Sequence, residues 1–143
     1  MASSTSPTPG EITILASGAI ALIFSFFDFY TVGDTGANVW SSGLFPLAAL
    51  MAIFVMIMAL QIALAKFTRV TLPSRPLGFT WEQIHLVLGF FATLYAVAFL
   101  LNDRGFGTSF GIGFWAILIA CVASLIGAVL LQKERAGSAG PSY

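Results

Sequence analysis

The sequence contains few charged residues, a single cysteine and a single histidine. Only 8% of its 143 residues are Asp, Glu, Lys or Arg, whereas a soluble domain typically has about 25%. Such a chain lacks the residues to cover a water-facing surface, which argues against a soluble domain. The six basic residues balance the six acidic ones, so the net charge gives no indication of a nucleic-acid partner. One cysteine excludes an internal disulfide and a CxxC redox pair.

Long apolar runs take the place of the missing charge. The chain is 58% hydrophobic, with a mean hydropathy of +0.95. A bilayer core about 30 Å thick needs roughly 20 apolar residues per helix, and four stretches meet that length. The stretches are continuously apolar rather than alternating, which favours helices over a barrel. The predicted spans are residues 12–32, 44–65, 81–101 and 109–132.

These spans predict an all-α membrane protein with four transmembrane helices in a compact up-down bundle. Two helix starts have the residues of a capping box, Thr8 with Glu11 and Thr80 with Gln83. Pro9, which follows Thr8, would take the first helical position. The Ser, Thr and Pro content of the first residues is typical of a disordered tail. The predicted organisation is a disordered tail at 1–10, a transmembrane domain at 11–132 and a short C-terminal tail at 133–143.

The basic residues predict the orientation of the chain in the membrane. Five of the six lie in the loop after the second span or beyond the fourth span: Lys66, Arg69, Arg75, Lys133 and Arg135. Arg104 alone lies in a loop on the opposite side. Because the side rich in basic residues is normally cytoplasmic, we expect both termini and the middle loop to be cytoplasmic.

Three segments carry a resemblance to a known group of proteins. SFFDFY, NVWSSGLFPLAAL and GFGTSFGIGFWAILIA resemble segments of small four-helix membrane proteins of unknown function from actinobacteria. The resemblance covers most of the chain. It implies a bacterial plasma membrane and no known activity.

Small residues recur at helical spacing in every span and predict where the helices touch. In lipid, helices associate through small residues that let their backbones approach. The small residues of the fourth span suit contact with a partner chain equally well. The predicted contact residues are Ser17, Ala21 and Ser25; Ala48, Ala52, Ala59 and Ala63; Gly89, Ala92 and Ala96; and Gly113, Ala116, Ala120, Ser124 and Gly127.

Asp28 lies among five aromatic rings in the segment FSFFDFY. If the first span continues to residue 32, this carboxylate sits about 6 Å below the outer surface of the membrane core. It shares a helix face with Ala21 and Ser25, so it should point into the bundle. We interpret it as a structural cap bonded to Arg104, Tyr95 or loop amides, with proton or cation handling as the alternative.

Glu82 and His85 are three residues apart at the inner end of the third span. His85 shares a face with Gly89 and should point inward, where Gln61 and Glu11 lie at a comparable depth. A Glu-x-x-His pair can supply two metal ligands in a helical bundle, but such sites repeat the motif on another helix. This chain has one histidine, so the sequence predicts no metal site and no cofactor.

The sequence has no Gly-rich phosphate loop and no suitably exposed Ser/His/Asp set, so it predicts no catalytic residue. We expect a non-enzymatic accessory, scaffolding or assembly subunit of a plasma-membrane complex. Its partners would be the lipid bilayer and other membrane chains or further copies of itself, and no nucleic acid. The alternative is a small transporter or channel-forming oligomer with a polar path. The candidate functional residues are Asp28, Tyr95, Arg104, Glu82, His85 and Gln61.

Overall fold

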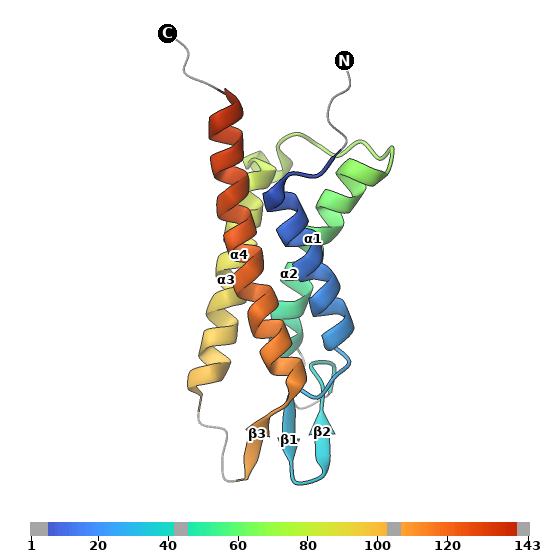
Figure 1. Ribbon diagram of the computed structural model, residues 1–143, viewed down its shortest axis with the longest axis vertical. Coiled ribbons are helices and arrows are strands. Elements are labelled where there is room, and N and C mark those ends of the chain that lie inside the picture. Colours follow the sequence, from blue (N-terminus) through green and yellow to red (C-terminus); the bar gives the residue numbers. More distant parts are fainter. Residues whose placement is uncertain (1–5, 42–45, 103–106, 140–143) are drawn as a thin grey trace.

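The computed structural model describes residues 6–41, 46–102 and 107–139, and this part of the chain contains four α-helices and a small antiparallel sheet. The helices are α1 (Pro9–Phe24), α2 (Leu47–Phe67), α3 (Trp81–Leu101) and α4 (Ile112–Ala139), with a short 3-10 helix, η1 (Pro76–Gly78), before α3. The strands are β1 (Tyr30–Val32), β2 (Thr35–Ala37) and β3 (Thr108–Phe110). Figure 1 shows the sheet at one end of the helices, here called the sheet end. The start of α1, the end of α4 and the α2–α3 connection lie at the opposite end, here called the terminal end (Figure 1).

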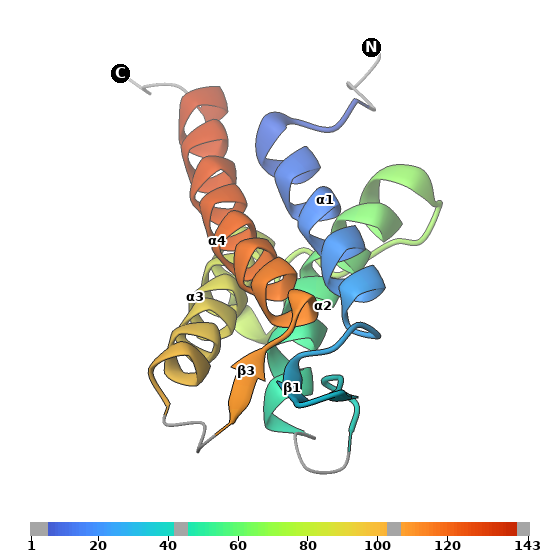
Figure 2. The ribbon, with the colours of Figure 1, turned by 60° about the horizontal axis from the view of Figure 1, so that its bottom comes forward.

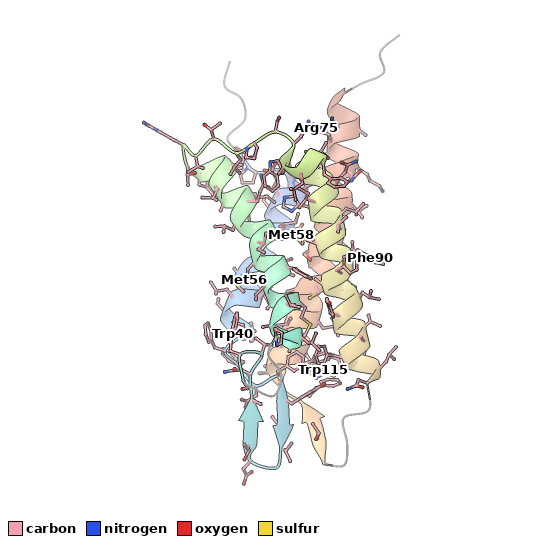
Figure 3. All side chains as sticks on the ribbon, turned by 180° about the vertical axis from the view of Figure 1, so that it is seen from behind. Trp40, Met56, Met58, Arg75, Phe90 and Trp115 are labelled. Carbon is pink, nitrogen blue, oxygen red and sulfur yellow. The ribbon has the colours of Figure 1, made fainter. Side chains whose placement is uncertain are left out.

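Three helices of the described part are long and apolar enough to cross a membrane, over Leu47–Phe67, Trp81–Leu101 and Ile112–Gly137. α1 is also apolar, but its 16 residues extend about 24 Å, which is less than a bilayer core of about 30 Å. The outer faces carry large apolar side chains, and Phe90 (Figure 3) is 53% exposed. Helices that are apolar on the outside as well as the inside are typical of membrane spans. The chain is therefore a membrane protein with transmembrane helices.

Both predicted capping boxes are present at the terminal end. At the start of α1, Thr8 Oγ1 accepts from the Glu11 N–H (3.4 Å), the Glu11 carboxylate accepts from the Thr8 N–H (3.3 Å), and Pro9 follows the cap. Thr80 and Gln83 exchange the same two bonds at 3.3 and 2.9 Å at the start of α3. Each box satisfies N–H groups that a helix start leaves unpaired. These caps fix which residues of α1 and α3 face the interior at the terminal end.

The prediction of one continuous helix over residues 12–32 is wrong, because α1 ends at Phe24. The Ser25 N–H still donates to the Ala21 oxygen in helical fashion (3.0 Å). The Phe27 N–H instead donates to the oxygen of Phe24, only three residues back (3.1 Å). This tighter turn closes the helix, and the chain continues into β1. The remainder of the predicted span is therefore not helical.

β1 is the central strand of the sheet, whose order is β2-β1-β3. Tyr30 pairs with Ala37 of β2 on one side and with Phe110 of β3 on the other. Aromatic and β-branched residues, which make up β1, fit a strand better than a helix. Gly33 supplies the positive φ, 60°, at the turn between β1 and β2. The fold is consequently mostly helical with a small sheet, rather than all-α.

The other predicted spans differ from the helices by a few residues at their ends. α3 coincides with its predicted range. α2 ends at Phe67, slightly later than predicted. α4 begins at Ile112 instead of Ser109, because β3 occupies the preceding residues, and it continues to Ala139. Most of the predicted C-terminal tail is therefore helical, and this extension brings its charged residues to the terminal end.

α1 and α3 each pack against α2 and α4, which also contact each other. Figure 2 shows α1 beside α4 along their length. Gly18 of α1 lies so close to Ala59 of α2 that a Cβ added at Gly18 would overlap the Ala59 methyl group. A Cβ added at Gly89 of α3 would lie 3.0 Å from the Leu125 Cα of α4. Small residues therefore set the spacing between helices, as they do in other membrane proteins.

Two clusters of buried apolar side chains fill the interior. The larger cluster reaches the sheet end, where the Phe29 ring packs against the rings of Phe99 and Phe114, with centroids 5.3 and 5.1 Å apart. Phe29 directly precedes β1 and is 0% exposed, so its ring joins the sheet to the helices. The smaller cluster lies toward the terminal end and consists of Ile14, Met58, Ile62 and Ala128.

Candidate functional site

Asp28 lies at the sheet end, between α1 and β1, and its side chain is exposed. Its main-chain oxygen accepts a hydrogen bond from the Gly113 N–H (2.9 Å). A Cβ added at Gly36 would overlap the Asp28 carboxylate, and a Cβ added at Gly111 would overlap its main chain. The prediction that Asp28 points into the helix bundle is wrong, because α1 ends before Asp28 and no longer sets its direction.

The predicted partners of Asp28 were Arg104, Tyr95 or loop amides. Arg104 lies outside the described residues, so this pairing stays a prediction. Tyr95 lies on α3, where its ring packs 6.2 Å from the ring of Phe54 on α2. Within the described residues, the Asp28 carboxylate makes no hydrogen bond or ion pair. The sheet end therefore presents an exposed carboxylate rather than a buried acid.

His85 and Gln61, which the sequence placed at a comparable depth, meet at the terminal end. His85 Nε2 lies 2.7 Å from Gln61 Oε1, so this hydrogen bond joins α3 to α2. The His85 side chain is 2% exposed, although the residue lies in only the second turn of α3. The prediction that His85 points into the bundle is confirmed by its burial.

Two ion pairs join the helices around this hydrogen bond. Lys66 Nζ at the end of α2 lies 3.4 Å from Glu11 Oε2 in the first turn of α1. Arg135 Nη1 on α4 lies 2.7 Å from Glu82 Oε1 in the first turn of α3. Each pair links an acid in the first turn of one helix to a basic residue near the end of another. Glu82 and His85 thus have partners on different helices, Arg135 on α4 and Gln61 on α2.

Glu134 is a site residue that the sequence analysis missed, because α4 was predicted to end at residue 132. Its Oε1 accepts a hydrogen bond from the Gly10 N–H (2.9 Å), which joins α4 to the start of α1. A signal was present in the sequence: Glu134 follows Gly127 by seven residues, and Gly127 was predicted to lie on the packing face of α4. A residue seven positions after a packing glycine lies two helical turns further along the same helix face, so Glu134 is also directed at the neighbouring helix.

Two adjoining pockets at the terminal end lie among these polar groups, and together we call them the terminal-end pocket. The first has a volume of about 140 Å³ and includes Gln61, Lys66, Trp81 and His85 in its lining. The second has a volume of about 200 Å³ and includes Glu134 and Arg135. Both are lined by Glu11, Glu82 and Leu131.

The terminal-end pocket has both apolar and charged side chains in its lining. Among the described residues, no group of three His, Cys, Asp or Glu side chains is placed to hold a metal ion. Cys121, the single cysteine, is buried within α4, away from these groups, and its carbonyl oxygen accepts from the hydroxyls of Thr93 (3.1 Å) and Ser124 (2.7 Å).

A second hollow, here called the α1–α2 groove, runs between these two helices. It has a volume of about 350 Å³ and is lined only by apolar residues: Leu15, Gly18, Ala19, Leu22, Met56, Ala59, Leu60 and Ala63. Half of these residues are glycine or alanine, so the groove is open because its floor lacks bulky side chains. Figure 3 labels Met56 on α2 at this groove.

Comparison of the chain with protein-family models, with curated proteins and with solved structures gave no match.

Proposed function

We propose that the chain is a non-enzymatic subunit of the bacterial plasma membrane that acts by packing against other membrane-spanning chains. In this proposal the four helices form an up-down bundle in the membrane. The protein would serve as an accessory, scaffolding or assembly subunit. The α1–α2 groove is the observation that supports this function.

The groove has the composition of a helix-docking surface. Gly18, Ala59 and Ala63 form a floor without bulky side chains, and the side chains of Leu15 and Leu60 flank it. A helix from another chain can approach such a floor closely and gain van der Waals contact along its length. Lipid chains are flexible and gain less from a fixed hollow, so a rigid helix is the occupant that this shape favours.

The distribution of basic residues supports the proposed orientation. Lys66 and Arg135 take part in the ion pairs of the terminal end, and Figure 3 places Arg75 at the same end. Because basic residues collect on the cytoplasmic side, the terminal end would face the cytoplasm. The partner helix in the groove would then span the membrane beside α1 and α2.

Transport through a single chain is the weaker alternative. Its path would run from Asp28 at the sheet end to His85 at the terminal end. Between them the interior is filled by the two apolar clusters, and the buried hydroxyls of Ser17, Ser25 and Ser124 each bond to a main-chain oxygen of their own helix. An ion path across a membrane needs a continuous series of polar groups or water.

Filling the groove tests the proposed function. Ala19 is exposed and lines the groove, so Ala19→Leu would occupy it without altering the core. Ala16 is exposed on the same helix but does not line the groove, so Ala16→Leu is the matched control. The protein would be purified from its own membrane in mild detergent, and its stoichiometric partners and its self-association would be measured.

We expect Ala19→Leu to lose the partner, or the self-association, that wild type and Ala16→Leu retain. Absence of any partner and of self-association in the wild type would contradict the proposal. Equal retention by both variants would show that the groove is not the contact surface.

A further inference from the structure

One buried nitrogen of a residue that lines the terminal-end pocket lacks a hydrogen-bond partner among the described residues. His85 Nε2 bonds to Gln61 Oε1, and a carbonyl oxygen only accepts, so in the neutral ring Nε2 carries the hydrogen. Nδ1 is then an acceptor, and it has no hydrogen-bond partner among the described residues. The side chain is 2% exposed and lines the first pocket. A buried acceptor without a donor is costly, and His85 is part of the lining of a pocket of about 140 Å³.

A buried oxygen in the adjoining pocket has the same deficiency. Glu134 Oε1 accepts from the Gly10 N–H, but Oε2 is buried and has no partner among the described residues. Glu134 lines the second pocket. Both unmet groups are therefore acceptors, and both require a donor.

The residues that line the two pockets carry more negative than positive charge. The described lining includes the carboxylates of Glu11, Glu82 and Glu134 and the cations of Lys66 and Arg135, so three negative charges face two positive ones. Lys66 and Arg135 are each paired with one carboxylate, which leaves Glu134 without a cationic partner in the described ion pairs. One further positive charge that donates hydrogen bonds would complete the balance.

We propose that the terminal-end pocket binds a primary ammonium group, R–NH₃⁺, carried either by an ethanolamine lipid headgroup or by a small free amine. Such a group has one positive charge and three N–H donors, which match the excess carboxylate and the unmet acceptors. A pocket of about 140 Å³ suits a group of a few heavy atoms. Trp81, which lines it, adds a ring that attracts cations. A quaternary ammonium has the charge but no N–H donor, so the pocket should reject it.

The test compares ethanolamine with choline on the full-length protein in detergent at matched ionic strength. Binding is measured by isothermal titration calorimetry and by the shift in Tm, since a ligand that binds the folded state raises Tm. We expect ethanolamine to bind and to raise Tm, and choline to do neither. Equal binding of both compounds, with equal increases in Tm, would overturn the proposal, because charge alone would then explain the binding.

Nanodiscs distinguish the two sources of the ammonium group. If the source is a lipid, phosphatidylethanolamine nanodiscs should raise Tm relative to phosphatidylcholine nanodiscs, even if free ethanolamine has no effect. If the source is a free amine, ethanolamine should raise Tm equally in both nanodiscs. No response to ethanolamine in either form would overturn the proposal.

A charge-neutral variant locates the binding site. Glu134→Gln keeps an oxygen for the Gly10 N–H and removes the unpaired charge, so we expect it to fold and to bind ethanolamine at least tenfold more weakly. Asp34→Asn removes an exposed carboxylate in the β1–β2 turn at the sheet end and should bind as wild type does. Circular dichroism without ligand checks the folding of both. Equal affinities of the two variants for ethanolamine would show that ethanolamine binds outside the terminal-end pocket. If Glu134→Gln does not fold, the comparison of ethanolamine with choline on the wild-type protein still tests the proposal.

Discussion

The two ends of the molecule hold their helices together by different means. At the sheet end, main-chain hydrogen bonds within a three-stranded sheet and packed aromatic rings connect α1, α3 and α4. At the terminal end, side chains do this work, through the His85–Gln61 hydrogen bond, the Glu82–Arg135 ion pair and the contact of Glu134 with the start of α1. The sheet end relies on main-chain bonds and packed rings, and the terminal end relies on side-chain hydrogen bonds and ion pairs. Among the described residues, buried polar atoms without a hydrogen-bond partner occur at both ends: Trp40 Nε1 at the sheet end, and His85 Nδ1 and Glu134 Oε2 at the terminal end.

If the terminal-end pocket binds an ammonium group as proposed, this difference separates a structural end from a binding end. A sheet with buried rings gains its stability from contacts that salt and small ligands do not reach. A cluster of charged groups beside a pocket is sensitive to both, because each charge responds to ions and to a bound partner. Changes at the sheet end should therefore alter stability alone, and changes at the terminal end should also alter ligand response.

The largest effect is expected at Phe29, the ring that joins the sheet to the helices. Phe29→Ala removes a fully buried ring and leaves a cavity, so the free energy of unfolding should fall by about 3–5 kcal/mol. Phe26→Ala is the matched control, because Phe26 is 65% exposed and its loss should cost less than about 0.5 kcal/mol. Denaturant unfolding in detergent measures both. Similar losses in the two variants would show that the sheet end is not packed as described.

The sequence predicted the helical parts of the fold well and the sheet end poorly. Long apolar runs and the two capping boxes placed α3 and the start of α1, because these signals are local. The segment from Phe29 to Val32 follows the apolar run of α1 and is rich in large side chains, and periodicity does not tell such a short strand from a helix. What makes it a strand is pairing with Thr108–Phe110, which lies far away in the sequence.

The candidate site was predicted only in part, because only some of its residues are placed by local signals. His85, Gln61 and Glu11 were placed at one depth because they lie at helix ends whose start signals are local. Glu134 was missed because the end of the apolar run was taken as the end of the fourth helix. A helix that continues beyond its apolar run gives no such signal of where it ends. The pocket depends on that extension, so it required the structure.

An intermediate effect is expected from the His85–Gln61 hydrogen bond at the terminal end. His85→Phe or Gln61→Leu leaves the other polar group without its partner, and each should cost about 1–3 kcal/mol of unfolding free energy. In a double-mutant cycle the two losses should not add, with a coupling above about 0.5 kcal/mol, because both remove the same bond. Additive losses would mean that the two side chains do not stabilise each other.

The smallest effect is expected from the ion pair between Glu82 and Arg135, because the Arg135 side chain is 69% exposed. Exposed ion pairs contribute about 0.2–1 kcal/mol, so Arg135→Gln should lower the free energy of unfolding by no more than that at low salt. Near 1 M salt, where the screening length is about 3 Å, the difference from wild type should nearly vanish. Arg69→Gln, an exposed residue of the α2–α3 connection, is the control and should show no salt-dependent loss. The same pair of salts applied to Phe29→Ala should leave its loss almost unchanged, because a buried ring is not screened. A loss at Arg135 that is independent of salt would show that the two ends do not differ in the way proposed.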